Sequence, residues 1–109
     1  MKGIGVDIVD LDRLDISNEK FVKRILSLHE YEVFQSLSSH RQLEFLGGRF
    51  AAKEAYMKAN HVGLGGLSFQ SIEILNHSDG SPYFANDPHA SISISHEEKY
   101  AIAFVIKEE

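Results

Sequence analysis

The chain has 109 residues, of which 43% are apolar and 25% charged, values that are ordinary for one globular domain over residues 1–109. It contains no cysteine, which excludes disulfides, thiolate metal sites and cysteine nucleophiles. A net charge of −5 argues against a nucleic-acid binder. No stretch approaches the about 20 apolar residues that a membrane-spanning helix needs, so we expect a cytoplasmic protein without membrane partners.

The first predicted element is a strand over residues 3–9. Its apolar residues at positions 4, 6 and 8 lie on one face, whereas Asp7 lies on the other face, next to Gly3 and Gly5. A carboxylate buried there needs a cation or hydrogen-bond donors, and the glycines leave room for a ligand to approach the backbone. A lone strand aspartate is more often a turn cap or ion-pair member than a metal ligand, so both roles stay open.

Helical patterns follow the strand. The apolar residues at positions 21, 22, 25 and 28 predict a first helix. Ser27 followed by Glu30 is a capping-box signature, which predicts a break and a second short helix through Leu37. The first of these helices begins near Asn18.

The longest predicted helix covers roughly residues 40–60 and opens with another capping-box signature, Ser39 followed by Gln42. Gly47 and Gly48 lie inside it, and each costs about 1 kcal/mol relative to alanine. They indicate that another segment approaches the helix closely there, or that the helix bends. Its buried stripe is predicted to comprise Leu43, Leu46, Phe50 and Met57.

The pattern of the rest of the chain predicts β structure. A strand is predicted over residues 68–75, with Ile72 and Ile74 on one face, and residues 76–82 form a dense turn signal before the next strand starts at Tyr83. Residues 91–96 alternate strictly. Residues 100–106 are nearly all apolar, which favours a strand buried on both faces. Strands and helices in this order indicate the α+β class.

Glu54 and Lys58 lie four residues apart on one face of the long helix. Such a pair commonly just stabilises a helix by a few tenths of a kcal/mol. A helix carboxylate combined with Asp7 and an ammonium group would instead suit Mg²⁺ with a phosphate ligand. His96 ends a predicted strand, where a lone histidine is usually a surface residue. The other five histidines show no ligand spacing, so a zinc cluster is not expected.

Three segments together resemble one family, the holo-acyl-carrier-protein synthases. They are residues 3–8 (GIGVDI), residues 48–59 (GRFAAKEAYMKA) and residues 93–96 (SISH), and the resemblance extends over nearly the whole chain. It implies the single-repeat 4′-phosphopantetheinyl transferase fold, in which an antiparallel sheet packs with a long helix. It also implies a homotrimer with active sites between subunits.

The resemblance implies Mg²⁺-dependent transfer of 4′-phosphopantetheine from coenzyme A to a serine of apo acyl carrier protein, for fatty acid biosynthesis. Asp7 and Glu54 would be the metal ligands, Lys58 would contact the pyrophosphate, and Arg49 would meet the 3′-phosphate. His96 would lie beside the coenzyme A phosphates. The group that accepts the serine proton is open between Glu54, a metal-bound water and His96. Further coenzyme A contacts implied by position are Gly63, Gly65 and Ser95.

The stretch 11–20 is shorter than is typical of the family and rich in acidic residues. Family members present basic side chains from the first helix to the acidic carrier. His61 also departs from the family pattern, since a smaller residue is expected at that position. Two alternatives in function stay open: a non-catalytic binding module, and a transferase whose carrier protein belongs to a polyketide or peptide synthetase. The carrier-docking residues are predicted to be Arg13, Lys20, Phe21, Lys23 and Arg24.

Overall fold

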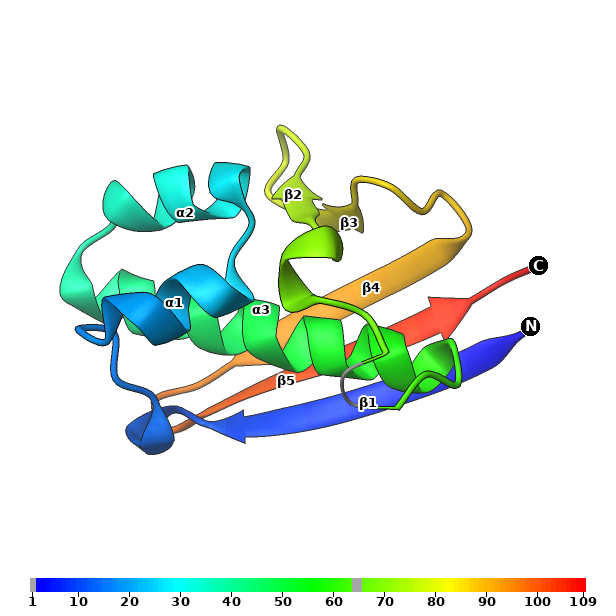
Figure 1. Cartoon of the computed structure of the whole chain (residues 1–109), viewed down its shortest axis with the longest axis horizontal. Helices are drawn as coiled ribbons and strands as arrows, with labels where there is room; N and C mark the ends of the chain where they lie inside the picture. Colours follow the sequence, from blue (N-terminus) through cyan, green and yellow to red (C-terminus); the bar gives the residue numbers. More distant parts are fainter. Residues whose placement is uncertain (1, 64–65) are drawn as a thin grey trace.

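The computed structural model describes residues 2–63 and 66–109, and its centre is a three-stranded antiparallel sheet in the order β1-β5-β4 (Figure 1). Gly3 pairs with Lys107, so the two ends of the chain lie side by side. A separate two-stranded hairpin packs beside β4. The strands are β1 (Gly3–Asp10), β2 (Ile74–Asn76), β3 (Pro82–Phe84), β4 (Ala90–His96) and β5 (Tyr100–Lys107).

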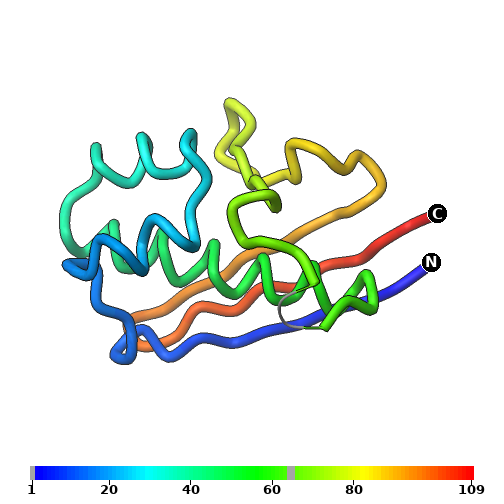
Figure 2. The backbone as a smooth tube through the Cα atoms, in the orientation of Figure 1, coloured from blue at the N-terminus to red at the C-terminus, as the bar shows by residue number. Residues whose placement is uncertain are grey.

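Helix α3 (Ser39–Ala59) lies across one face of the sheet, against β1 and β5, and helices α1 (Glu19–Ile25) and α2 (Leu28–Gln35) pack on α3 (Figure 2). Together with the antiparallel sheet, these helices confirm the predicted α+β class. In the parts of the chain that the structure describes, no helix is both long and apolar enough to cross a bilayer. Of the predicted stripe on α3, Leu46 and Met57 are buried, and Leu43 and Phe50 are partly buried.

Helix α3 contacts strand β1 so closely that the strand needs glycine. A Cβ added to Gly5 would overlap the carbonyl oxygen of Ala55, and Gly3 meets α3 in the same way. The prediction that these glycines leave room for a ligand is therefore wrong, because the helix backbone fills the space. The close approach predicted inside α3 is confirmed at Gly47, where a Cβ would overlap the side chain of Leu11.

The prediction that the last strand is buried on both faces is also wrong. Burial alternates along β5: Ala101, Ala103 and Val105 are buried, whereas Ile102 and Phe104 are 41% and 40% exposed. Helices cover only one side of the sheet, so β5 has one buried and one exposed apolar face. The outer sheet face is continued on β1 by the exposed side chains of Ile4, Val6 and Ile8.

A fully buried ion pair joins the helices. Lys53 Nζ lies 2.5 Å from Glu30 Oε1 and 2.7 Å from the carbonyl oxygen of Ile25. Glu30 also accepts hydrogen bonds from the backbone N–H groups of Ile74 and Ser27, and with Ser27 it forms the predicted capping box. Removing either charge would leave its partner buried and unpaired, which is strongly destabilising. The pair therefore ties α3 to α2 and to the end of α1.

The second predicted capping box does not form. Ser38, not Ser39, precedes the first turn of α3, and its side chain makes no capping hydrogen bond. Gln42 donates instead to the carbonyl oxygen of Phe34, at 2.9 Å, which ties the start of α3 to the end of α2. The signature is thus used for packing between helices.

The strand predicted over residues 68–75 forms only at its end. Its first half contains a 3₁₀ turn, Phe69–Ser71, because the Ser68 side chain accepts a hydrogen bond from the backbone N–H of Ser71. Both Ile72 and Ile74 are buried. The dense turn signal before Tyr83 is confirmed as the turn of the β2-β3 hairpin.

Candidate active site

Asp7, Glu54 and Lys58 meet where β1 contacts α3. Lys58 Nζ lies 3.0 Å from Asp7 Oδ1 and 3.0 Å from the carbonyl oxygen of Val6. The Asp7 carboxyl also lies next to that of Glu54, close enough to affect its ionisation. Lys58 therefore reaches from the helix to the strand, which is more than the pairing of Glu54 and Lys58 along one helix would require. The Lys58 side chain is 57% exposed and the Asp7 side chain 15%, so the cluster opens to solvent.

Burial, followed by repulsion from the Asp7 carboxylate, raises the pKa of Glu54 to about 7. Lys58 lowers the pKa of Glu54, but its effect is smaller. Two touching carboxyl groups resist ionising together, so the pair retains a proton close to neutral pH. A divalent cation bound between the oxygens would relieve the same repulsion.

The donor set at this cluster fits Mg²⁺. This ion prefers oxygen ligands and takes one or two protein carboxylates, while phosphates and waters complete its octahedron. Asp7 and Glu54 supply two carboxylates in contact, and Glu54 also lines a pocket of about 450 Å³ from which the remaining ligands can enter. We call this cavity the Glu54 pocket.

The Glu54 pocket also contains two of the residues predicted to dock the carrier protein. Arg13 and Phe21 line it together with Glu54, and Tyr100 contributes from β5. Phe21 packs edge-on against the Phe50 ring, with 5.8 Å between ring centroids. Phe21 is therefore a half-buried wall of the pocket and not a fully exposed anchor.

The other predicted docking residues do not line this pocket. Lys20, Lys23 and Arg24 are exposed on α1. Lys23 Nζ lies 2.8 Å from Glu19 Oε1 and 5.4 Å from the centre of the Tyr31 ring, so part of its charge is compensated within the chain.

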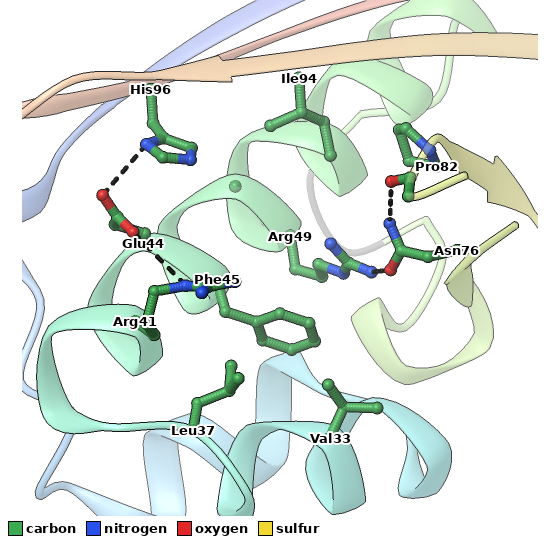
Figure 3. Close-up of a pocket in the computed structure, with 12 residues that line it drawn as sticks. Val33, Leu37, Arg41, Glu44, Phe45, Arg49, Asn76, Pro82, Ile94 and His96 are labelled. Atoms are coloured by element: carbon green, nitrogen blue, oxygen red, sulfur yellow. Dashed lines mark hydrogen bonds and ion pairs between the residues drawn. The ribbon is translucent and has the colours of Figure 1, made fainter. Parts of the chain in front are cut away.

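Arg49 and His96 line a second pocket, of about 400 Å³, which we call the Arg49 pocket (Figure 3). It shares no lining residue with the Glu54 pocket. Polar and apolar side chains from α2, α3, the β2-β3 hairpin and β4 form its walls. The remaining side chains that line it include Val33, Leu37, Arg41, Glu44, Phe45, Asn76, Pro82 and Ile94.

The Arg49 guanidinium is largely buried, and one of its nitrogens has no partner in the part of the chain that the structure describes. One terminal nitrogen lies 2.5 Å from Asn76 Oδ1 and 3.3 Å from the carbonyl oxygen of Ile74. Nε is buried without a hydrogen-bond partner among the described residues. Burial lowers the pKa of Arg49 to about 10 although nearby Glu30 raises it, so the side chain stays cationic at neutral pH. A buried cation with a spare donor suits an anionic ligand.

His96 is held by a residue that the sequence analysis did not select. Its Nδ1 lies 3.2 Å from Glu44 Oε2. Glu44 precedes His96 by 52 positions in the sequence. Asn76, the partner of Arg49, lies in a segment whose pattern predicts only a turn. The one available signal was the Glu44-Phe45-Leu46 segment, which also resembles the synthases but carries no chemistry by itself.

The remaining predicted contacts are scattered. Gly63 is exposed after the end of α3, and Gly65 lies outside the described residues. Ser95 pairs with Ile102 on the outer sheet face, whereas His96 pairs with Ala101 on the face under α3. A single chain therefore does not bring the side chains of Ser95 and His96 to one ligand.

Comparison with known proteins agrees with this arrangement. The chain matches the 4′-phosphopantetheinyl transferase superfamily over residues 3–105. It is 50% identical to a holo-[acyl-carrier-protein] synthase of Anoxybacillus flavithermus, covering 97% of this chain and 94% of the relative. It is 46% identical to the synthase of Enterococcus faecalis, covering 99% and 97%.

Solved structures show the same fold. The crystal structure of a holo-(acyl-carrier-protein) synthase from Bacillus anthracis, in complex with CoA (3′,5′-ADP), is 42% identical and has a TM-score of 0.88. The alignment covers 95% of this chain and 93% of that one. Sequence and structure thus agree over nearly the whole chain, and the chain belongs to the holo-[acyl-carrier-protein] synthases of the 4′-phosphopantetheinyl transferase superfamily.

Proposed function

We propose that the protein moves the 4′-phosphopantetheine group of coenzyme A to a serine of apo acyl carrier protein in a Mg²⁺-dependent reaction. The observation that carries this proposal is the contact between Asp7, Glu54 and Lys58. These residues come from two elements and form one solvent-accessible cluster of two carboxylates and an amine. Arg13 and Phe21, predicted to meet the carrier, line the same pocket as Glu54.

In this reaction the serine oxygen bonds to the β-phosphorus of coenzyme A, and the bond from that phosphorus to adenosine 3′,5′-bisphosphate breaks. Asp7 and Glu54 would hold Mg²⁺, which supplies polarisation of the phosphoryl oxygens when bound. Lys58 would turn from Asp7 to donate to the leaving phosphate and stabilise its developing charge. Glu54 lines the pocket that the serine enters, which favours Glu54 over His96 of the same chain as the acceptor of its proton.

The Arg49 pocket would bind the phosphates of the adenosine half of coenzyme A. Because the two pockets share no residue, we propose that coenzyme A lies between the Glu54 pocket of one subunit and the Arg49 pocket of a neighbour in a homotrimer. The outer sheet face supports assembly, since Ile8 and Phe104 are 61% and 40% exposed there. Light scattering should report a trimer, and a fully active monomer at micromolar concentration would contradict the assembly.

We further propose that the carrier belongs to fatty acid biosynthesis and that the protein works in the cytoplasm. The similarity to proteins named holo-[acyl-carrier-protein] synthases favours this carrier over those of polyketide and peptide synthetases. Comparing turnover of the three carrier types by the same protein tests this assignment. A preference for a synthetase carrier would overturn it.

The decisive experiment incubates the protein with coenzyme A, Mg²⁺ and apo carrier protein and weighs the carrier by mass spectrometry. We expect the carrier to gain one phosphopantetheine group. The gain should disappear with a chelator and with a carrier whose serine is replaced by alanine. If the protein binds coenzyme A but the carrier never gains mass, it is a binding module and the proposed activity is wrong.

A further inference from the structure

Glu44 is electrostatically out of place in the Arg49 pocket. Under the proposed function this pocket binds phosphate, yet Glu44 adds a carboxylate to its wall (Figure 3). The side chain is only 17% exposed. A buried carboxylate close to an anion would repel it unless another interaction of the carboxylate contributes more. The partners of Glu44 therefore need an explanation.

Three cationic or ionisable side chains surround this carboxylate. Oε2 lies 3.2 Å from His96 Nδ1 and 3.5 Å from His40 Nε2, and Oε1 lies 3.9 Å from Arg41 Nε. His40 and Arg41 are 73% and 67% exposed, so their contacts with Glu44 are screened by water and weak. His96 is the nearest of the three and comes from a different element, strand β4.

The contact fixes which nitrogen of His96 faces the pocket. An ionised carboxylate only accepts hydrogen bonds, so the imidazole nitrogen beside it, Nδ1, must carry the hydrogen. Nε2 is then the nitrogen left for a ligand, and it donates to an anion when the ring is protonated on both nitrogens. Figure 3 shows Nε2 turned away from Glu44. A second-layer acceptor of this kind sets both the tautomer and the rotation of a histidine ring.

Arg49 is held in a comparable way by Asn76, at 2.5 Å. Each predicted phosphate contact in this pocket thus has an acceptor beside it, Asn76 for Arg49 and Glu44 for His96. We propose that Glu44 is a positioning residue that holds His96 with Nε2 directed toward a phosphate of bound coenzyme A. This inference rests on the proposed function.

The test uses isothermal titration of the whole protein with adenosine 3′,5′-bisphosphate. Glu44→Ala should weaken binding about tenfold, since loss of a partner that orients a ligand-binding histidine has an effect on this scale. Glu44→Gln keeps an acceptor oxygen and should lose only a few-fold. Glu32→Gln makes the same charge change on an exposed position of α2 outside the pocket and should bind like the wild type.

A double-mutant cycle separates positioning from general damage. If Glu44 acts through His96, then Glu44→Ala should weaken binding far less in a His96→Ala background than in the wild type. An equal loss in both backgrounds overturns the inference, and so does tighter binding by Glu44→Gln, which would mean that the carboxylate only repels the ligand. If Glu44→Ala fails to fold, Glu44→Gln and its cycle with His96→Ala decide the question. A wild type that binds the bisphosphate but transfers nothing would overturn the proposed activity alone.

Discussion

The two pockets place charge in different ways. At the Glu54 pocket and the cluster beside it, the charged groups contact one another directly, since Lys58 donates to Asp7 and Asp7 lies next to Glu54. In the Arg49 pocket the Arg49 guanidinium and the His96 ring are instead each held by an acceptor, Asn76 or Glu44. The first arrangement can exchange a proton for a metal ion close to neutral pH, whereas the second keeps its donors fixed in place. We therefore expect changes in the first to affect the chemical step and changes in the second to affect binding.

The largest effect should follow removal of a carboxylate from the cluster of Asp7, Glu54 and Lys58. Asp7→Ala or Glu54→Ala should lower the rate of transfer about 100-fold or more, because either change removes a proposed Mg²⁺ ligand. The measurement is the initial rate of carrier modification at saturating Mg²⁺, with the circular dichroism melt as a check of folding.

A matched control is Asp12→Ala, which removes an equal charge from an exposed position after β1. This variant should transfer at close to the wild-type rate. If Asp7→Ala or Glu54→Ala turns over like Asp12→Ala in Mg²⁺, the assignment of the metal ligands is wrong.

A smaller effect, on binding, should follow Arg49→Lys. Lysine keeps the charge but lacks the planar guanidinium, in which one terminal nitrogen donates to both Asn76 and the carbonyl oxygen of Ile74 and further N–H groups remain for a phosphate. The KM for coenzyme A should rise about tenfold, while kcat and the KM for the carrier change little. Steady-state kinetics with each substrate varied in turn checks this. If kcat instead falls by a larger factor than KM rises, the assignment of the chemical step to one pocket and of binding to the other is wrong.

The same contrast explains what the sequence could predict. Asp7, Glu54 and Lys58 lie in two segments with recognisable patterns, a glycine-bearing strand and a helix, and these segments pack directly against each other. The α+β class and the two short helices were likewise readable from periodicity and from the Ser27 capping signature. Local patterns are sufficient where two elements meet along their whole length.

Features that depend on which elements become neighbours could not be read in this way. Glu44 and Asn76 gain their roles only after β4 and the β2-β3 hairpin fold against α3. The two-sided burial predicted for β5 failed for a related reason: apolar residues on an uncovered face, such as Phe104, look the same in sequence as core residues. Lys53, in the most recognisable motif, pairs with Glu30 in the core, and no spacing indicates that contact.

A several-fold effect should arise from the basic face of α1, next to the Glu54 pocket. Arg24→Glu should raise the KM for carrier protein several-fold and leave the KM for coenzyme A unchanged, because exposed complementary charges chiefly speed association. Added salt should act in the same selective way. Lys23→Glu should have a smaller effect, since Lys23 already pairs with Glu19.

These measurements also test whether the docking surface is electrostatic. If Arg24→Glu, Lys20→Glu and added salt all leave the KM for the carrier unchanged, the contact is chiefly apolar and runs through Phe21 in the Glu54 pocket. In that case repulsion between the carrier and the acidic residues between β1 and α1 would not need to be offset by basic side chains.

The smallest expected effect is on stability against pH, measured without Mg²⁺. The pKa of Glu54 is raised from its ordinary 4.5 to about 7, so the folded protein binds a proton that the unfolded chain has already lost between these values. The stabilising contribution of protonated Glu54 is fully present below pH 4.5 and is lost as pH rises through about 7. Glu54→Gln cannot titrate and should lack this loss.

The quantity to measure is the difference in Tm between the wild type and Glu54→Gln at several pH values from 4 to about 8. Comparing the two proteins removes the contribution of groups such as Asp87 and Glu73, whose lowered pKa values change stability in the opposite sense. The wild type should lose stability relative to Glu54→Gln as pH rises, and added Mg²⁺ should reverse that loss only in the wild type. A constant difference in Tm would mean that Glu54 is ionised throughout, and the Glu54 pocket would then hold as fixed a charge as the Arg49 pocket does.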